Sequence, residues 1–285
     1  MKVVVRRARA SDRAPLMKFV RNVWGGHDYI PSVWEEWLAD RRAILDVVEV
    51  DGKPVGMGRL RFLDDGVGWL EGARVHPDYR GRGLAGQIGR DLIRTGREKG
   101  VTSFRLTSGS RNKSAHRQVA KLGFSEVARV SVYEPSEGAR FDPQTKVWQA
   151  AENETDEVFN MIVGSQEYRL GGGVFWDGFS ATELSLGILT NLVDRGSVLR
   201  CDEAVAISKL GGEGGSPWRQ VCFIAGSPEG AVRLVKHALG KKEAVRTRWR
   251  LAFIPQGSRL IRELRNMGMR RSSSLILFES ADSKD

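Results

Sequence analysis

Cysteine is scarce in this sequence, and long hydrophobic runs are missing. Cys201 and Cys222 are the two cysteines in 285 residues, which is too few for a disulfide framework, and they lack the spacing of a metal site. No apolar run approaches the roughly 18 residues of a membrane span, and the opening MKVVVRR is too short for a signal peptide. These absences predict a cytoplasmic protein in a reducing compartment, with no membrane partner.

Histidine is also rare, and charge of one sign is never concentrated. The 45 Lys and Arg residues exceed the 35 Asp and Glu residues by 10, a surplus that would suit nucleic acid. The basic residues are scattered in singles and pairs among opposite charges, so we expect no nucleic-acid partner and assign part of the surplus to a small anionic ligand. We also expect no metal, because ligand spacing is missing among the four histidines, His27, His76, His116 and His237.

What the sequence does contain is a glycine-rich stretch, Val75–Gly86 (VHPDYRGRGLAG). Before it, Gly68–Val75 has the length and apolar content of a strand, and after it Leu84–Lys99 carries apolar residues at helical spacing. The predicted helix therefore begins inside the glycines.

The residues of this stretch suit a pyrophosphate group. Gly81 and Gly83 can adopt positive φ, which lets backbone N–H groups turn towards a ligand. The helix start adds unpaired N–H donors and the positive end of its dipole, and Arg80 and Arg82 add full charges. The alternative is a glycine-rich turn that binds nothing.

The stretch lacks the spacing of the P-loop and of the Rossmann turn, and it resembles motif A of the GNAT acetyltransferase superfamily, [QR]xxGx[GA]. The family's V-x-P precedes it at Val75 and Pro77, and the motif itself covers Arg80, Gly81, Arg82, Gly83, Leu84 and Ala85. The resemblance implies that this loop holds the pyrophosphate of acetyl-CoA, the co-substrate. It further implies cofactor contacts from Ala73, Arg74, Val75 and Asn112.

A second stretch, NKSAHRQVAKLGF, resembles motif B of the same superfamily, NxxAxxLYxKxGF. The matching residues are Asn112, Ala115, Lys121, Gly123 and Phe124. Gln118 replaces the leucine, and Val119 stands where the family usually has the tyrosine that protonates the departing CoA thiolate, so that role is not carried over. A thiol with a pKa near 8.5 leaves tolerably as thiolate, and Tyr133, Tyr79 or water could substitute.

The predicted elements around both motifs follow the order of the superfamily. In chain order they are a strand at Val3–Arg7, a helix capped by Ser11-Asp12 and reaching Val23, a helix at Ser32–Asp40, strands at Ile44–Val50, Val55–Phe62 and Gly68–Val75, the helix after the loop, a strand at Thr102–Thr107 and a helix at Asn112–Leu122. This order predicts an α/β (α+β) fold with a mixed central sheet flanked by helices.

Glu71 is the predicted general base. The family runs its strand alongside the pantetheine and acyl group, where a carboxylate can take the ammonium proton directly or through one water; the alternative is a solvated or salt-bridged glutamate. A backbone N–H near Arg74 or Val75 would polarise the thioester carbonyl. His116 is a second candidate proton carrier, and a plain helix-surface histidine is its alternative.

The segment WGGHDYIPSVWEEWL and the strand LEGARVHPDYRGRG are similar to those of the vertebrate histidine N-acetyltransferase group, over roughly the first 135 residues. This similarity implies a free amino acid or another small primary amine as acceptor. Arg74 is the candidate for binding its carboxylate, and Trp24, Asp28 and Tyr29 could line the pocket. Core packing is the alternative for the aromatic residues.

The second half repeats the first at an offset of 145 residues, which places Gly123 over Gly268. We predict two tandem GNAT-like domains, an active one at 1–136 and a degenerate one at 145–285, with a turn-rich junction between them; two unrelated α/β pieces are the alternative. At this offset the arginine loop falls on AGSPEG, where Pro228 removes a donor and Glu229 repels phosphate.

Together these features favour an acetyl-CoA-dependent N-acetyltransferase that acts on a primary amine of a small molecule. One alternative is peptide or protein N-terminal acetylation, which needs an open cleft. Another is a non-catalytic acyl-CoA sensor, which the valine in motif B favours. The oligomeric state is left open by the sequence.

Overall fold

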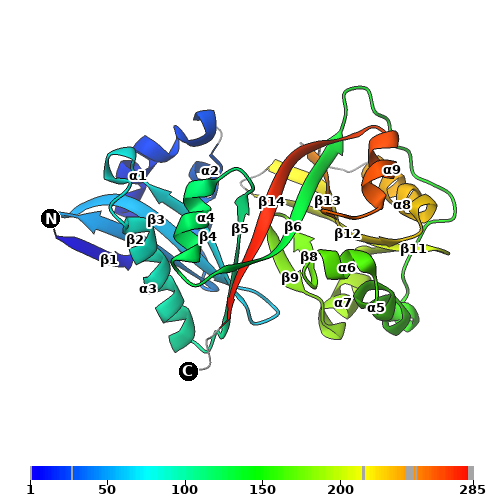
Figure 1. Cartoon of the computed structure of the whole chain (residues 1–285), viewed down its shortest axis with the longest axis horizontal. Coiled ribbons are helices and arrows are strands. Elements are labelled where there is room, and N and C mark those ends of the chain that lie inside the picture. Colours follow the sequence, from blue (N-terminus) through cyan, green and yellow to red (C-terminus); the bar gives the residue numbers. More distant parts are fainter. Residues whose placement is uncertain (1, 27, 214–215, 242–246, 248, 282–285) are drawn as a thin grey trace. The chain divides into compact units, whose positions relative to one another are not determined.

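The computed structural model describes residues 2–26, 28–213, 216–241, 247 and 249–281 (Figure 1). Contacts divide the chain into two compact units. In the described part of the chain, the first unit comprises residues 2–26, 28–126, 213 and 278–281, and the second comprises residues 127–212, 216–241, 247 and 249–277. These units differ from the continuous ranges 1–136 and 145–285 expected from the sequence, because the end of the chain joins the first unit.

The first unit has the element order that the sequence predicts. Its elements are β1 (Val3–Arg7), η1 (Ala10–Asp12), α1 (Arg13–Val20), η2 (Val23–Gly26), α2 (Ile30–Ala39), β2 (Ala43–Val50), β3 (Lys53–Phe62), β4 (Gly68–Val75), η3 (Pro77–Tyr79), α3 (Leu84–Glu98), β5 (Ser103–Gly109) and α4 (Lys113–Ala120). The strands lie in the order β1-β2-β3-β4-β5, followed by the end of β14 (Met269–Ala281). Strands β1 to β4 pair antiparallel and β4 pairs with β5 parallel, so the predicted mixed sheet is confirmed.

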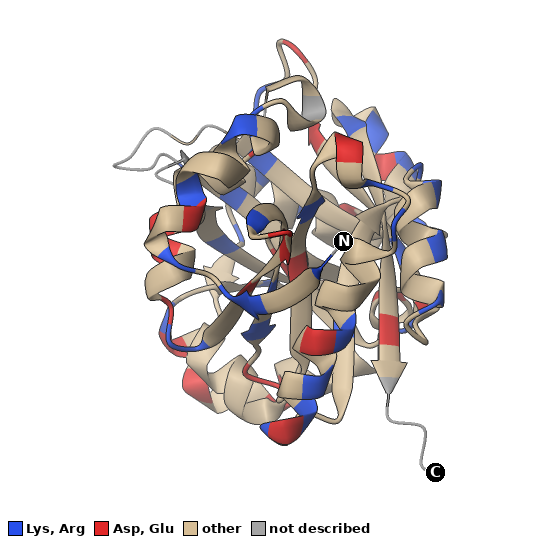
Figure 2. Ribbon diagram, turned by 90° about the vertical axis from the view of Figure 1, so that its left-hand side faces the viewer, with Lys and Arg blue, Asp and Glu red and all other residues tan. Residues whose placement is uncertain are grey.

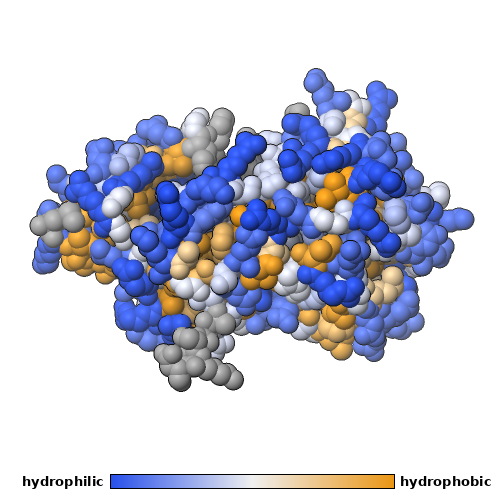
Figure 3. All heavy atoms as spheres, in the orientation of Figure 1, coloured by the Kyte–Doolittle hydropathy of each residue, from blue (hydrophilic) through white to orange (hydrophobic). Residues whose placement is uncertain are grey.

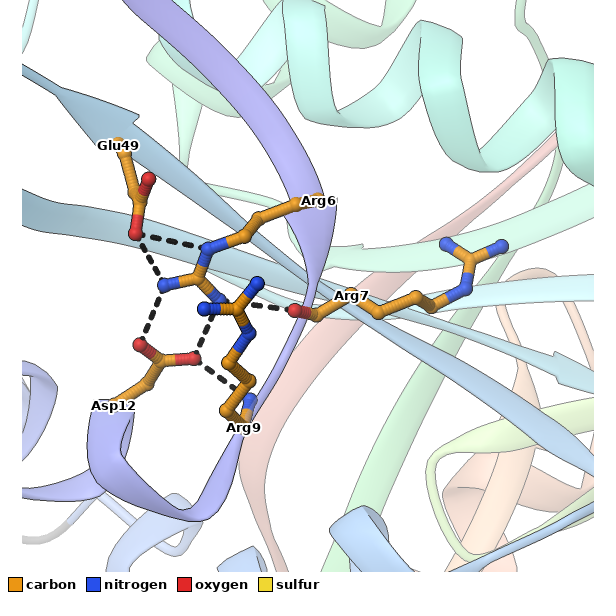
Figure 4. Close-up of polar contacts among 5 residues, drawn as sticks. All are labelled: Arg6, Arg7, Arg9, Asp12 and Glu49. Atoms are coloured by element: carbon orange, nitrogen blue, oxygen red, sulfur yellow. Dashed lines mark hydrogen bonds and ion pairs between the residues drawn. The ribbon is translucent and has the colours of Figure 1, made fainter. Parts of the chain in front are cut away.

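The start of the first predicted helix is different, because Asp12 does not cap it. Its carboxylate accepts hydrogen bonds from Arg6 Nη1 and Nη2, both 2.8 Å, and from the Arg9 N–H at 2.7 Å (Figure 4). Glu49 of β2 pairs with the same arginine. Burial alone would raise the pKa of the Asp12 carboxyl. The hydrogen bonds from Arg6 and from the Arg9 N–H together have the larger effect, so the pKa of Asp12 is lower than usual. Asp12 thus ties the chain to β1 and β2, and the helix ends earlier than predicted, at Val20.

Helix α3 is held on the sheet by the apolar face that the sequence predicts. Leu84, Ile88, Leu92 and Ile93 are between 2% and 8% exposed, and each such burial contributes about 1.5–3 kcal/mol. Gly58 of β3 lets the helix approach closely, since a Cβ there would lie 2.8 Å from a methyl carbon of Ile88. The packing fixes the first turn of α3 at the end of β4.

The second unit repeats this order of elements. After β6 (Ser125–Pro135) come β7 (Trp148–Gln149), η4 (Glu152–Glu154), α5 (Thr155–Val163), α6 (Gln166–Leu170), β8 (Val174–Asp177), β9 (Ser180–Glu183), α7 (Leu186–Asp194), β10 (Val198–Cys201), β11 (Ala204–Glu213), β12 (Ser216–Gly226), α8 (Pro228–Gly240), β13 (Trp249–Pro255), α9 (Leu260–Asn266) and β14. Strands β8 and β9 form a hairpin of their own, and the others lie in the order β14-β6-β13-β12-β11-β10-β7. Without the hairpin, the series from β7 to β14 parallels the series from β1 to β6. Gly123 and Gly268 follow α4 and α9 with φ of +83° and +89°, which agrees with the predicted offset.

The surface carries mixed charge. Lys and Arg alternate with Asp and Glu on the side seen in Figure 2, and hydrophobic residues on the face in Figure 3 form separate groups between hydrophilic ones. Both cysteines are described and are buried free thiols. Among the described residues, no helix combines the length and the apolar character needed to cross a membrane.

Candidate functional site

The loop between β4 and α3 holds two glycines in the left-handed region. Gly81 has φ +77° and Gly83 has φ +76°, a conformation that side chains of L residues rarely adopt. Apart from chain neighbours, no described heavy atom lies within 4 Å of a Cβ placed on either residue. The glycines are therefore required by the backbone, and the space beside the loop is open.

The start of α3 offers hydrogen-bond donors. Its first helical bond runs from Gln87 N to the Gly83 carbonyl at 3.1 Å, so the N–H groups of Leu84, Ala85 and Gly86 precede the helical ladder. The N-cap residue, Gly83, has no side chain that could cap this start. Leu84 is 2% exposed and packs in the core, which anchors the first turn of the helix. An anion is the partner that uncapped donors at a helix N-terminus favour.

Two exposed arginines brace the same loop. Arg80 Nε donates to the Val75 carbonyl at 3.1 Å, and Arg82 Nη2 donates to the Asp78 carbonyl at 3.1 Å. The Arg82 guanidinium also lies 5.2 Å from the centre of the Tyr79 ring. These contacts hold both positive charges beside the glycines.

Strands β4 and β5 diverge towards this loop. Among the described residues they pair at Gly68–Phe104 and Trp69–Arg105, although β4 continues to Val75. The backbone of β4 from Leu70 onward is therefore not used in pairing with β5. A ligand with amide groups can bond there as an extra strand would.

A bulge in β4 turns its backbone at the middle of this region. Arg59 pairs with Glu71 and Met57 with Arg74, so two residues of β4 face one residue of β3. Gly72, inside the bulge, has φ +67°, and a Cβ on it would lie 2.6 Å from the Trp37 ring. Ala73, the next residue, is exposed on the strand, as a cofactor contact requires.

Glu71, the predicted base, lies in a network of ion pairs. Its carboxylate binds Arg59 Nη1 and lies 3.7 Å from Arg61 Nε. Arg59 is 5% exposed, binds Asp40 through Nη2 and lies 4.7 Å from the Trp37 ring centre. The structure thus shows a salt-bridged Glu71, and its role as a base stays a prediction. The sequence did not reveal Arg59 and Asp40, because a buried arginine on a strand has the same pattern as an exposed one.

Three of the predicted acceptor residues lie together. Arg74 Nε donates to Asp28 Oδ2 at 2.6 Å, and its guanidinium lies 5.9 Å from the Tyr29 ring centre. Asp28 also accepts a hydrogen bond from the Ile30 N–H at 3.0 Å, which fixes the start of α2. The side chain of the fourth residue, Trp24, lies outside the described residues.

The motif B helix, α4, presents Asn112 and His116. Asn112 caps the helix by accepting from the Ala115 N–H at 3.2 Å, so its amide NH₂ group is not used in the cap. The His116 Nε2 lies 3.0 Å from the Gly109 carbonyl at the end of β5. Because a carbonyl can only accept, Nε2 is the donor, and Nδ1 carries the lone pair of the neutral ring.

Tyr133, predicted as a possible acid, lies on β6. It is 1% exposed in the core of the second unit, where it pairs with Ala252 of β13. Residues 127–212 belong to that unit, which the local sequence around β6 did not indicate. The role of Tyr133 as an acid stays a prediction.

The second unit has a different helix start at the aligned position. Ser227 Oγ accepts from the Gly230 N–H at 3.0 Å and donates to Glu203 Oε2 at 2.8 Å. A side chain thus occupies the place that an anion could take at Gly83. This cap is consistent with the predicted loss of the pyrophosphate site.

Comparison with known sequences finds a family and several relatives. Residues 13–124 match the model of the acetyltransferase (GNAT) family. Histidine N-acetyltransferase of Oreochromis niloticus is 31% identical over 124 residues, and that of Xenopus tropicalis is 30% identical over 115 residues. The matches cover 41% and 38% of this chain and 36% of each relative. The chain thus spans about a third of the length of these relatives.

A solved structure extends the likeness to nearly the whole chain. The GCN5-related N-acetyltransferase from Sphaerobacter thermophilus superposes with a TM-score of 0.63, covering 98% of this chain and 95% of that one. Its sequence is 14% identical, so this likeness concerns the fold alone.

Proposed function

Because residues 13–124 are a domain of the acetyltransferase (GNAT) family, we propose that the chain transfers the acetyl group of acetyl-CoA to a primary amine of a small molecule. The observation that carries the proposal is the loop at Gly81 and Gly83. It combines open space, uncapped helix donors and two arginines at the end of a strand that diverges from its neighbour.

The residues present fit a coenzyme A thioester. The main-chain donors of Gly81 to Gly86 and the charges of Arg80 and Arg82 would hold the two phosphates. The pantetheine amides would bond to the β4 backbone between Leu70 and Val75. When bound, acetyl-CoA supplies an activated acyl group with a thiolate leaving group, and a β4 N–H near Arg74 or Val75 would polarise its carbonyl.

Proton transfer is assigned to Glu71 and His116. Arg59 orients the Glu71 carboxylate, which would take the ammonium proton through water. His116 is held by the Gly109 carbonyl with Nδ1 as acceptor. Water is the proposed proton source for the departing thiolate.

A free amino acid is the proposed acceptor class. The similarity to histidine N-acetyltransferases supports it, and so does the cluster of Asp28, Tyr29 and Arg74, in which Asp28 orients the guanidinium that would meet an acceptor carboxylate. We also propose that the second half is a duplicate of the first and that it has lost its function. The competing function is a non-catalytic acyl-CoA binder, which Val119 in place of the motif B tyrosine favours.

Release of free CoA thiol from acetyl-CoA tests the proposal. The full chain is assayed with histidine, other free amino acids, amines that lack a carboxylate, and a short peptide. We expect thiol release that depends on a free amino acid. Acetyl-CoA binding without thiol release for any amine would support the non-catalytic binder, and a preference for the peptide would support N-terminal acetylation.

A further inference from the structure

The end of β14 belongs to the first unit. Phe278, Glu279 and Ser280 of β14 belong to that unit, and β14 lies next to β5 in its sheet. Strand β5 is the one that diverges from β4 beside the proposed thioester site. Residues from the far end of the sequence thus flank β5, the strand on one side of that site.

Glu279 fixes β5 through its side chain. It accepts hydrogen bonds from Ser103 Oγ at 2.7 Å and from Arg105 Nε at 3.1 Å. Arg105 is 6% exposed and also binds Asp65 Oδ2 at 3.0 Å, in the turn before β4. Removing one carboxylate partner of a buried guanidinium destabilises the fold strongly, because it leaves a buried charge uncompensated. This chain of contacts connects β14 to β5 and to the start of β4, where the two strands part.

Phe278 and Ser280 lie against α4. The Phe278 ring centre is 5.3 Å from that of His116, and Phe278 is 7% exposed. The Ser280 hydroxyl lies 3.8 Å from a Cβ placed on Gly123, just after the helix. The imidazole is therefore held from two sides, by the Gly109 carbonyl and by an aromatic ring from the last strand.

We propose that Glu279 and Phe278 are positioning residues of the acetyl transfer site. Glu279 fixes the position of β5, and thereby the gap between β4 and β5 in which the thioester binds. Phe278 fixes the orientation of the His116 ring. This inference rests on the proposed function, because it gives these residues a role in the same site.

Substitutions in the full chain test the two roles separately. Glu279→Gln keeps the size of the side chain and removes its charge, so we expect the Kd for acetyl-CoA to rise about tenfold, which corresponds to about 1.4 kcal/mol. Phe278→Ala frees the imidazole, so we expect kcat to fall by up to about a hundredfold while the Kd for acetyl-CoA stays within a few-fold. Phe278→Tyr retains the ring and should restore most of kcat.

The matched control is Glu203→Gln, which removes a carboxylate that also accepts from a serine hydroxyl, but in the second unit. All titrations are made well below the melting temperature of each variant, so that lost stability does not alter the Kd of the folded chain. Hydrogen exchange gives an independent readout: amides of Ser103–Gly109 should exchange faster in Glu279→Gln and those of Val198–Cys201 should not.

The outcomes separate this inference from the function on which it rests. If the unaltered chain binds no acetyl-CoA, the proposed function fails. If the unaltered chain binds it and Glu279→Gln binds equally well with unchanged exchange in β5, the role of Glu279 is wrong. A parallel fall of kcat in Phe278→Ala and Phe278→Tyr would refute the role of the ring.

Discussion

Replacing Gly83 gives the sharpest test of the phosphate loop. At φ +76° an L side chain costs about 1–2 kcal/mol, and the open space beside the residue means that steric clash adds little. In Gly83→Ala the unliganded loop can relax to negative φ. Binding the ligand then requires residue 83 to return to positive φ, which costs the same free energy. The affinity for acetyl-CoA should therefore fall by about 5- to 30-fold. Gly83→Asn should lose less, because asparagine tolerates the left-handed region, and Gly83→Glu should lose most, because its charge faces the phosphates.

Isothermal titration of each variant with acetyl-CoA measures the effect, and circular dichroism checks the fold. Gly66→Ala is the matched control, since Gly66 has φ +80°, equally open surroundings and a place in the turn before β4. It should bind acetyl-CoA as the unaltered chain does. Equal affinity in all three Gly83 variants, with native circular dichroism, would refute the assignment of this loop to the pyrophosphate.

Three further predictions concern the base, the second unit and the pH dependence of stability. Glu71→Gln should lower turnover about a hundredfold near pH 7, and less at higher pH, where an α-amino group with a pKa of about 8 deprotonates unaided; a pH-independent loss would indicate a structural glutamate. Titration should give one acetyl-CoA per chain, because Ser227 caps the aligned helix, and a stoichiometry of two would contradict this. Burial raises the pKa of Asp46 to about 6 despite its ion pair with Arg7. The folded state then holds a proton that the unfolded state has lost between about pH 4 and 6, so this residue should make stability fall as pH rises through that window, by roughly 3 kcal/mol. Urea unfolding measures this effect. Between about pH 4 and 6 the free energy of unfolding of the unaltered chain should fall relative to that of Asp46→Asn, and a difference between the two that does not change with pH would contradict the prediction.

The parts of the fold that depend on neighbouring residues were predictable from the sequence. The strand Gly68–Val75 and the helix from Leu84 have the predicted bounds within one residue, because alternation, helical spacing and glycine act over a few positions. The positive φ of the loop glycines was predictable for the same reason, because it depends on the glycines themselves and their chain neighbours.

Partners far apart in the sequence were not predictable. The carboxylate of Asp12 looked like a helix cap because its arginine partner lies on another element. Glu71 looked equally like a base or a paired residue, since no local feature indicates that Arg59 turns inward. Tyr133 follows the first unit closely in sequence, yet it is buried in the core of the second, and its local sequence did not indicate this.

The return of β14 to the first unit also has a consequence for biosynthesis. Ser103 and Glu279, which are hydrogen-bonded, are separated by 176 positions. At about 5–20 residues per second, a ribosome needs roughly 10–35 s between synthesising these two residues. During that interval β5 has no partner on the side that β14 later occupies, and its exposed edge could pair with strands of other chains. Premature termination before Phe278 would make this temporary exposure permanent, so truncated chains should be targets for chaperones and proteases even though every residue of the glycine loop is present.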